Sequence, residues 1–101
     1  MLIYNVTVQV EKEIAAQWLL WLQQEHIPEV LGTGCFGKHQ ILKLVDTDET
    51  DSVTYAIQYF SDSMELIEAY LNEHADVLRK KGFERWGNRY VAFRTIMEVV
   101  N

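Results

Sequence analysis

The sequence is poor in the residues that cross-link or interrupt a fold. Its 101 residues include one cysteine, Cys35, and one proline, Pro28. A single cysteine excludes an internal disulfide framework, and together with only three histidines it argues against a structural zinc site. No apolar run approaches the ~20 residues of a membrane span, and the first residues lack the basic segment of a signal peptide. We therefore expect a cytoplasmic protein without a membrane segment.

Basic residues are also scarce. Nine Lys and Arg against 15 Asp and Glu give a net charge of −6, which argues against a nucleic-acid partner or a polybasic membrane contact. Linkers and low-complexity segments are missing too, so we expect a single domain over residues 1–101. Apolar residues are abundant at 49%, with 12% aromatic, which is enough for one core in a chain of this length.

The hydrophobic periodicity predicts six main elements. A period of two indicates strands, and a period near 3.6 indicates amphipathic helices. Asp62 followed by Glu65 resembles a capping box at the start of the second helix, and Gly82 suits its end. The predicted elements are strand 2–10, helix 11–31, strand 38–45, strand 53–60, helix 62–81 and strand 89–99.

The order of these elements is β-α-β-β-α-β. It predicts an α+β, ferredoxin-like fold, a four-stranded antiparallel sheet with both helices on one face. In this arrangement the first and third strands are central, and the fourth pairs with the first. The sheet face away from the helices has no cover within one chain.

That open face has a mixed character that we expect a second copy of the chain to cover. Apolar side chains among polar ones are unusual on a solvated face, so we expect a homodimer with a cavity between its two sheets. We assign three alternating sets to the open face: Ile3, Asn5, Thr7 and Gln9; Thr54, Ala56, Gln58 and Phe60; and Tyr90, Ala92, Arg94, Ile96 and Glu98.

Three residues of this face are candidate ligand-binding residues: Arg94, supported by Asn5 and Gln58. An arginine there needs an acceptor, because burying an unpaired guanidinium is costly. The acceptor would be an anionic ligand, a carboxylate of the second subunit or a cross-strand carbonyl. The alternative is a wet, partly polar interface without a ligand, and the sequence favours this alternative.

No motif predicts a catalytic residue, a metal or a cofactor. Residues 32–37 match the Gly-x-Gly-x-x-Gly spacing of dinucleotide sites, but they follow a predicted helix and precede a strand, which is the reverse of the required context. His26 and His74 lie on apolar helix faces, where a core histidine is the simpler interpretation. Cys35 has no identified base nearby, and Trp18 and Trp21 are interpreted as packing residues.

Several segments together resemble a known family. They are Ile3-Tyr4-Asn5-Val6-Thr7-Val8, Trp18 with Trp21, Glu25-His26-Ile27-Pro28-Glu29-Val30, Val53-Thr54-Tyr55, Gln58-Tyr59-Phe60 and Ala92-Phe93-Arg94-Thr95. The family consists of short bacterial proteins of unknown function in the dimeric α/β-barrel group of ferredoxin-like folds. The resemblance implies a homodimer whose sheets form a barrel, and it supplies no active site.

The wider group includes cofactor-independent and haem-degrading monooxygenases. The haem-degrading branch uses an Asn on the first strand, a Trp near the third strand and a His on the second helix. Asn5 and His74 occupy similar elements, but no Trp lies between Val53 and Leu71, so we do not predict haem.

Two functions remain from the sequence. The first is an uncharacterised homodimeric domain, with or without a small anionic or aromatic ligand between its sheets. The alternative is a cofactor-independent monooxygenase-like enzyme that acts on a small aromatic substrate in the barrel. The first is favoured, because no catalytic constellation stands out.

Overall fold

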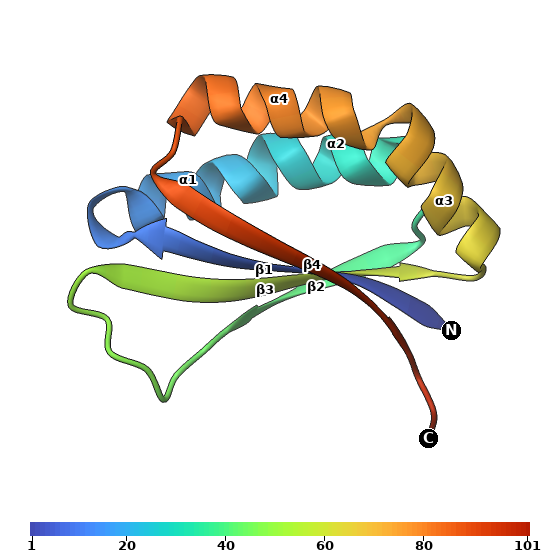
Figure 1. Cartoon of the computed structure of the whole chain (residues 1–101), viewed down its shortest axis with the longest axis horizontal. Helices are drawn as coiled ribbons and strands as arrows, with labels where there is room; N and C mark the ends of the chain where they lie inside the picture. Colours follow the sequence, from blue (N-terminus) through green and yellow to red (C-terminus); the bar gives the residue numbers. More distant parts are fainter.

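A computed structural model describes residues 1–101 and places all helices on one face of a four-stranded antiparallel sheet (Figure 1). The strand order is β2-β3-β1-β4, so the α+β, ferredoxin-like fold and the central position of the first and third strands are confirmed. The strands are β1 (Leu2–Glu11), β2 (Lys38–Lys43), β3 (Ser52–Ser61) and β4 (Tyr90–Glu98).

The central strand β3 alternates strictly between a buried and a more accessible side, and β1 does so less regularly, because Asn5 is buried as well and Val6 is half-buried. On β3 each odd-numbered residue from Val53 to Ser61 is buried, and on β1 Tyr4, Val8 and Val10 are buried. These side chains face the helices, as the period of two predicts. Their hydrophobic burial holds the helical layer on the sheet.

The first helical region is continuous in space although its hydrogen bonding changes along it. Pro28 has no N–H to donate, and the Ile27 N–H bonds to the Leu22 carbonyl, five residues earlier, which makes the turn before the proline π-helical. Pro28 predicts a kink or an end of the helix just before it; instead the helix passes through Pro28, and it ends at Gly32, where a stop is expected. Its segments are a 3-10 turn η1 (Lys12–Ile14), α1 (Ala15–Trp21), the π turn η2 (Leu22–His26) and α2 (Ile27–Gly32).

The second helical region consists of α3 (Met64–Glu73) and α4 (Ala75–Trp86), with a break at His74. The prediction that Asp62 caps it is wrong by one residue. The backbone of Ser63 is extended, and its hydroxyl accepts a hydrogen bond from the Leu66 N–H at 3.3 Å.

The prediction that this helix ends at Gly82 is also wrong. Gly82 is buried within α4, and the helix runs on to Gly87, which adopts a positive φ of 63°. A Cβ atom at Gly82 would lie 2.8 Å from the Tyr90 hydroxyl and 3.5 Å from the Trp21 ring. Gly82 therefore lies where β4 approaches α4 closely, and a side chain at this position would displace the Tyr90 hydroxyl.

Aromatic rings form the core beneath α3 and α4. Tyr4 lies 5.9 Å from Phe36 and 5.6 Å from Tyr70, measured between ring centroids, and Phe36 lies 5.1 Å from Tyr70 in an edge-on arrangement. Tyr59 completes the cluster, 5.4 Å from Phe36. Such pairs each add roughly 0.5–1.5 kcal/mol beyond the burial of their area. This cluster forms one wall of the cavity described below.

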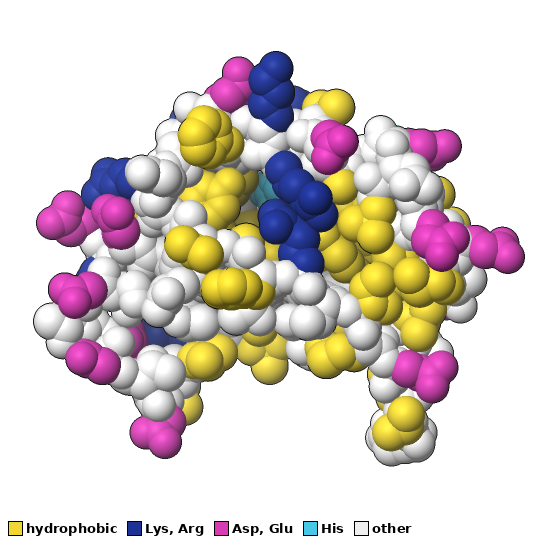
Figure 2. All heavy atoms as spheres, viewed as in Figure 1, with side chains coloured by type: hydrophobic (Ala, Val, Ile, Leu, Met, Phe, Trp, Pro, Cys, Tyr) yellow, Lys and Arg dark blue, Asp and Glu magenta, His cyan; other side chains and the backbone are white.

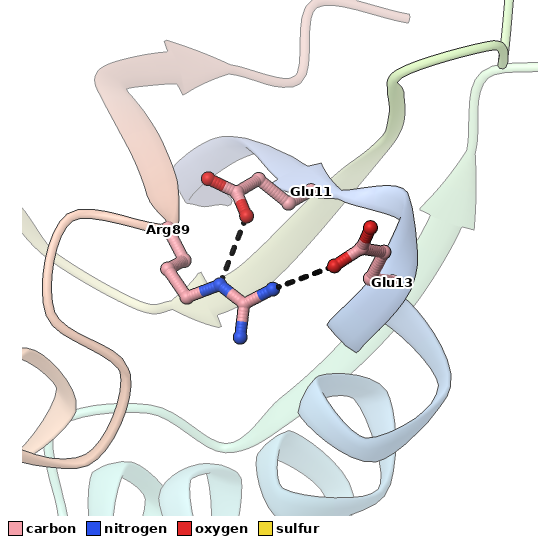
Figure 3. Close-up of polar contacts among 3 residues, drawn as sticks. All are labelled: Glu11, Glu13 and Arg89. Carbon is pink, nitrogen blue, oxygen red and sulfur yellow. Dashed lines mark hydrogen bonds and ion pairs between the residues drawn. The ribbon is translucent and has the colours of Figure 1, made fainter.

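The start of β4 is fixed to the end of β1 by Arg89 (Figure 3). Its guanidinium donates to Glu11 at 2.9 Å and to Glu13 at 3.3 Å. The Glu11 N–H also donates to the Arg89 carbonyl at 3.1 Å. These contacts determine which residues of β4 lie opposite those of β1.

Candidate functional site

Arg94 lies on the helix side of the sheet, so the prediction that it shares the open face with Asn5 is wrong. Residues directly opposite each other in an antiparallel pair have side chains on the same face. Arg94 is opposite Val6, and Thr95 is the residue opposite Asn5. The ligand site therefore cannot combine Arg94 with Asn5 and Gln58.

The same register corrects the assignment of the whole fourth strand. Tyr90 and Ala92 are opposite Val10 and Val8, on the helix side. Phe93 is opposite Thr7 and faces away from the helices. The more apolar side of β4, with Val91, Phe93 and Met97, therefore belongs to the open face.

Asn5 and Gln58 do lie together on the open face, as predicted. The Gln58 side-chain amide donates to the Asn5 carbonyl oxygen at 3.3 Å, and the Gln40 amide donates to the Gln58 carbonyl oxygen at 2.7 Å. Asn5 in turn donates to the hydroxyls of Thr7 at 3.0 Å and Thr95 at 3.4 Å. The polar groups form a connected network across the sheet.

A cavity on the other face lies between the sheet and the helices. It offers about 50 Å³ of space to the centres of water-sized molecules. Trp18 and Trp21 of α1 and Leu78 of α4 form its apolar walls, with Tyr90 and Ala92 of β4 beside them. Trp18 and Trp21 were interpreted as packing residues, and Trp18 is indeed 2% exposed.

Two arginines lie where this cavity meets a second, more open one of about 280 Å³. Both cavities include Tyr4, Arg79 and Arg94 in their walls. The Arg79 guanidinium donates to the Tyr4 hydroxyl at 3.1 Å. Neither arginine forms an ion pair; the ion pairs of the chain involve Lys43, Lys81 and Arg89. Arg79 and Arg94 therefore remain available to an anion.

Figure 2 shows the molecular surface around α4 and β4 from the viewpoint of Figure 1. Lys and Arg side chains gather between α4 and β4, hydrophobic side chains lie to either side, and a histidine is visible behind them. Acidic side chains lie mainly around the outline of this view, and some also lie on the helical layer above the basic group. The face thus has a locally basic centre in a chain whose net charge is −6.

The polar groups of the inner cavity are mainly hydrogen-bond donors. No Asp or Glu lines it. Burial raises the pKa of Tyr70 to about 12 and raises the pKa of Tyr59 strongly, so both hydroxyls stay protonated. The indole N–H of Trp18 is buried without a hydrogen-bond partner. A ligand rich in acceptors would satisfy such a lining.

His26 also lines the cavity, from the π turn η2. Burial lowers the pKa of His26 from 6.5 to about 4, Glu29 opposes this shift, and Arg94 adds to it. Its ring lies 5.0 Å from the ring of Trp21 and nearly parallel to it. His26 is therefore a neutral imidazole at pH 7, and π turns of this kind are frequent at functional sites.

Sequence reasoning missed Arg79 and the position of His26. Arg79 is not among the candidate residues of the sequence, where a basic residue near a helix C-terminus is explained by the helix dipole. Its signal was its place directly after Leu78, next to the buried stripe of α4. Pro28 is a signal for the π turn that places His26 in the cavity, but the direction of the His26 ring is visible only in the three-dimensional structure.

No three His, Cys, Asp or Glu side chains come together as metal ligands would. None of the helices combines the length and the apolar character that crossing a membrane requires. Residues 32–37 connect α2 with β2, as predicted.

Comparison with known proteins gives one family match and several structural matches. The model of a family described as a domain of unknown function, DUF4286, matches residues 1–100. No curated protein matches the chain.

Solved structures share the fold at low sequence identity. An ethyl tert-butyl ether d (EthD) family protein from Bacillus halodurans C-125 has a TM-score of 0.68 and 14% identity, over 99% of this chain and 100% of that one. A dimeric ferredoxin-like protein from an uncultured marine organism has a TM-score of 0.69 and 12% identity, over 99% and 95%. HapK from Hahella chejuensis has a TM-score of 0.69 and 9% identity, over 99% and 93%. At such identities these matches establish the fold alone.

Proposed function

Since the chain belongs to the DUF4286 family, whose function is unknown, we propose a function from its geometry: it binds a small anionic ligand with an apolar or aromatic body. The site is the cavity between the sheet and the helices, rather than the space between two sheets. The observation that carries this proposal is the pair Arg79 and Arg94, both without a carboxylate partner, at the edge of an aromatic cavity without acidic residues.

The charge balance of the chain supports this role. Acidic residues outnumber basic ones by 15 to nine, so carboxylates were available to pair with both arginines. Three of the nine Lys and Arg residues pair with glutamates, and among the unpaired ones only Arg79 and Arg94 line the aromatic cavity. Guanidinium groups bind carboxylates with two parallel hydrogen bonds, which suits a ligand with a carboxylate head.

The remaining lining favours a flat apolar body. Trp18, Trp21 and Tyr90 provide ring faces and edges against which an aromatic ligand packs. The unpartnered indole N–H of Trp18 and the protonated hydroxyls of Tyr59 and Tyr70 favour acceptor groups on that body. We therefore infer an aromatic carboxylate, or a phenol with a similar acidic group, as the ligand class.

The proposed assembly is a homodimer through the open face of the sheet. From Ile3 to Gln9 and across the paired residues of the other strands, this face carries one charged side chain, Lys38, although 24% of the chain is charged. Phe93 is 62% exposed and Val91 52% exposed there. Few charges and exposed apolar side chains are typical of the centre of an interface. Similar structures described as dimeric ferredoxin-like proteins support the same assembly.

The test is a titration with benzoate and with benzamide, its uncharged analogue, followed by calorimetry and thermal unfolding. Benzoate is expected to stabilise the protein in a saturable way, and benzamide is not. Arg94→Gln should weaken benzoate binding by about 10–100-fold, the effect of losing a charge-assisted hydrogen bond. Arg85→Gln is the matched control, because Arg85 is an exposed arginine that stacks on Trp86 and does not line the cavity.

The ligand proposal fails if small aromatic acids leave the unfolding temperature unchanged. It also fails if Arg94→Gln binds benzoate as tightly as the natural chain and the control Arg85→Gln do. A sedimentation mass near the 11.8 kDa of one chain at micromolar concentration would separately refute the homodimer.

A second candidate function is a cofactor-independent monooxygenase-like activity on a small aromatic substrate. The observation that favours it is the neutral imidazole of His26 stacked on Trp21 inside an aromatic cavity. A neutral histidine can hydrogen-bond to a phenolic substrate and hold it toward the arginines. Oxygen uptake with phenols that stabilise the protein would support this enzyme, and binding without oxygen uptake would favour the binding protein.

A further inference from the structure

The open face carries a polar row that crosses all four strands at one level. Gln40 is opposite Gln58, Gln58 is opposite Asn5, and Asn5 is opposite Thr95. Hydrogen bonds of 2.7, 3.3 and 3.4 Å connect these four side chains in the same order. We call Gln40, Gln58, Asn5 and Thr95 the amide row.

The rows on either side are largely apolar. One contains Phe60, Ile3 and Met97, with Lys38 at its end on β2, and the other contains Leu42, Ala56 and Phe93, with Thr7 between the last two. Each lies two residues along the strands, or roughly 7 Å, from the amide row. The open face is therefore a polar stripe between two apolar stripes.

The hydrogen bonds within the amide row leave both donors and acceptors unused. Gln58 uses one of its two amide N–H groups toward Asn5 and accepts one hydrogen bond from Gln40. Asn5 uses both N–H groups, toward Thr7 and Thr95, and retains acceptor capacity on its oxygen. The Thr95 hydroxyl accepts from Asn5 and still has a proton to donate. A surface with both kinds of free group can pair with its own copy.

We propose that the amide row sets the register of the homodimer, by packing against the same row of a second copy. This inference rests on the proposed homodimer. A two-fold axis makes the interface isologous, so the same row lies on both sides and its free donors can meet the free acceptors of the copy. A slip by one row would place the amides against Phe60, Ile3 and Met97 and leave them buried without partners, which is costly.

A polar element inside an apolar interface can select one packing among several that bury similar area. The apolar stripes supply the burial and by themselves favour no particular register. Asn5 is already 8% exposed in the single chain, so covering the face removes its access to water. The row therefore acts through specificity more than through affinity.

The test replaces the central pair by apolar residues of similar size, Asn5→Leu with Gln58→Met. Replacing both partners of a hydrogen bond together is expected to leave the fold intact, which circular dichroism checks. Gln9→Leu is the matched control, because Gln9 is an amide of the same strand and face outside the amide row. Gln40→Met is a second variant on the edge strand β2, where Gln40 is exposed and folding does not depend on it.

The readouts are sedimentation velocity and a spin-label distance between the two copies, with the label on an added cysteine at Asp76. Asp76 is exposed on α4, away from the sheet, and the natural Cys35 is buried. The natural chain and Gln9→Leu are expected to give one dimer with one narrow distance. Asn5→Leu with Gln58→Met is expected to give two or more distances or larger species, and Gln40→Met a smaller change of the same kind.

The outcomes separate the two proposals. A natural chain that sediments as a monomer refutes the homodimer itself. A dimeric natural chain whose amide-row variants keep the same narrow distance refutes the amide row alone. An equally broad distribution of spin-label distances in Gln9→Leu also refutes it, because the effect would then not be specific to the amide row.

Discussion

The burial of His26 makes the stability of the protein depend on pH in a calculable way. The pKa of His26 is about 4 in the folded chain and 6.5 in the unfolded chain. Above pH 6.5 the imidazole is neutral in both states and does not affect the balance between them. Below that pH the unfolded state binds a proton before the folded state does, so stability falls as the pH falls toward 4.

The two pKa values give the size of this effect. Acidification from pH 8 to pH 5 lowers the free energy of unfolding by about 2 kcal/mol through His26. This is a large part of the 5–15 kcal/mol typical of a domain. At pH 5 most carboxylates with ordinary pKa values near 4 are still ionised, so His26 dominates the change. The expected direction is a lower free energy of unfolding at the lower pH.

Urea unfolding at the two pH values measures this difference. His26→Gln is expected to lose most of the pH dependence, because glutamine does not titrate in this range. His39→Gln, at an exposed histidine on β2, is the matched control and should keep the pH dependence. If His26→Gln loses as much stability on acidification as the natural chain, the burial argument for a neutral His26 is refuted.

Other predictions concern β4 and its neighbours. Gly82→Ala gains about 1 kcal/mol of helix propensity, but its Cβ would lie 2.8 Å from the Tyr90 hydroxyl. We therefore expect a lower free energy of unfolding in urea, and we expect Tyr90→Phe to relieve this loss. Phe93→Asp places a charge within the proposed interface, on the edge strand β4, and sedimentation should then give a monomer that still folds. Arg89→Gln should cost at most about 1 kcal/mol, because its ion pairs with Glu11 and Glu13 are solvent-exposed, and the cost should shrink in high salt. A gain in stability from Gly82→Ala would contradict the close approach of α4 to β4.

The fold could be predicted from the sequence because its periodicities are strong and local. The alternation from Leu2 to Val10 and from Val53 to Phe60 marks two strands with one buried face, and both are central in the sheet. The helix boundaries were less reliable. Gly82 is a usual helix end, but here it lies inside the helix, where Tyr90 packs closely against α4. Tertiary contacts can thus override a local signal.

The candidate site could be predicted only in part. Arg94 is a candidate because an arginine buried on the open face would need an acceptor; it lies on the other face, where it does line a cavity. Arg79 and His26 were not recognised as parts of the same cavity, because they come from α4 and from a π turn far apart in the sequence. Sequence periodicity indicates which side of a helix is buried, and the meeting of two helices at one strand depends on the packing.

The position of Arg94 shows why the face of an edge strand is hard to predict. A period of two assigns alternate residues to opposite faces, and the more apolar set is normally assigned to the core. On β4 both sets are substantially apolar, since one faces the helices and the other the open face. The register is fixed where the Glu11 N–H donates to the Arg89 carbonyl, which places Tyr90 opposite Val10. Counting from that pair puts Arg94 in the cavity and Phe93 on the open face, so one strand contributes to both the proposed ligand site and the proposed interface.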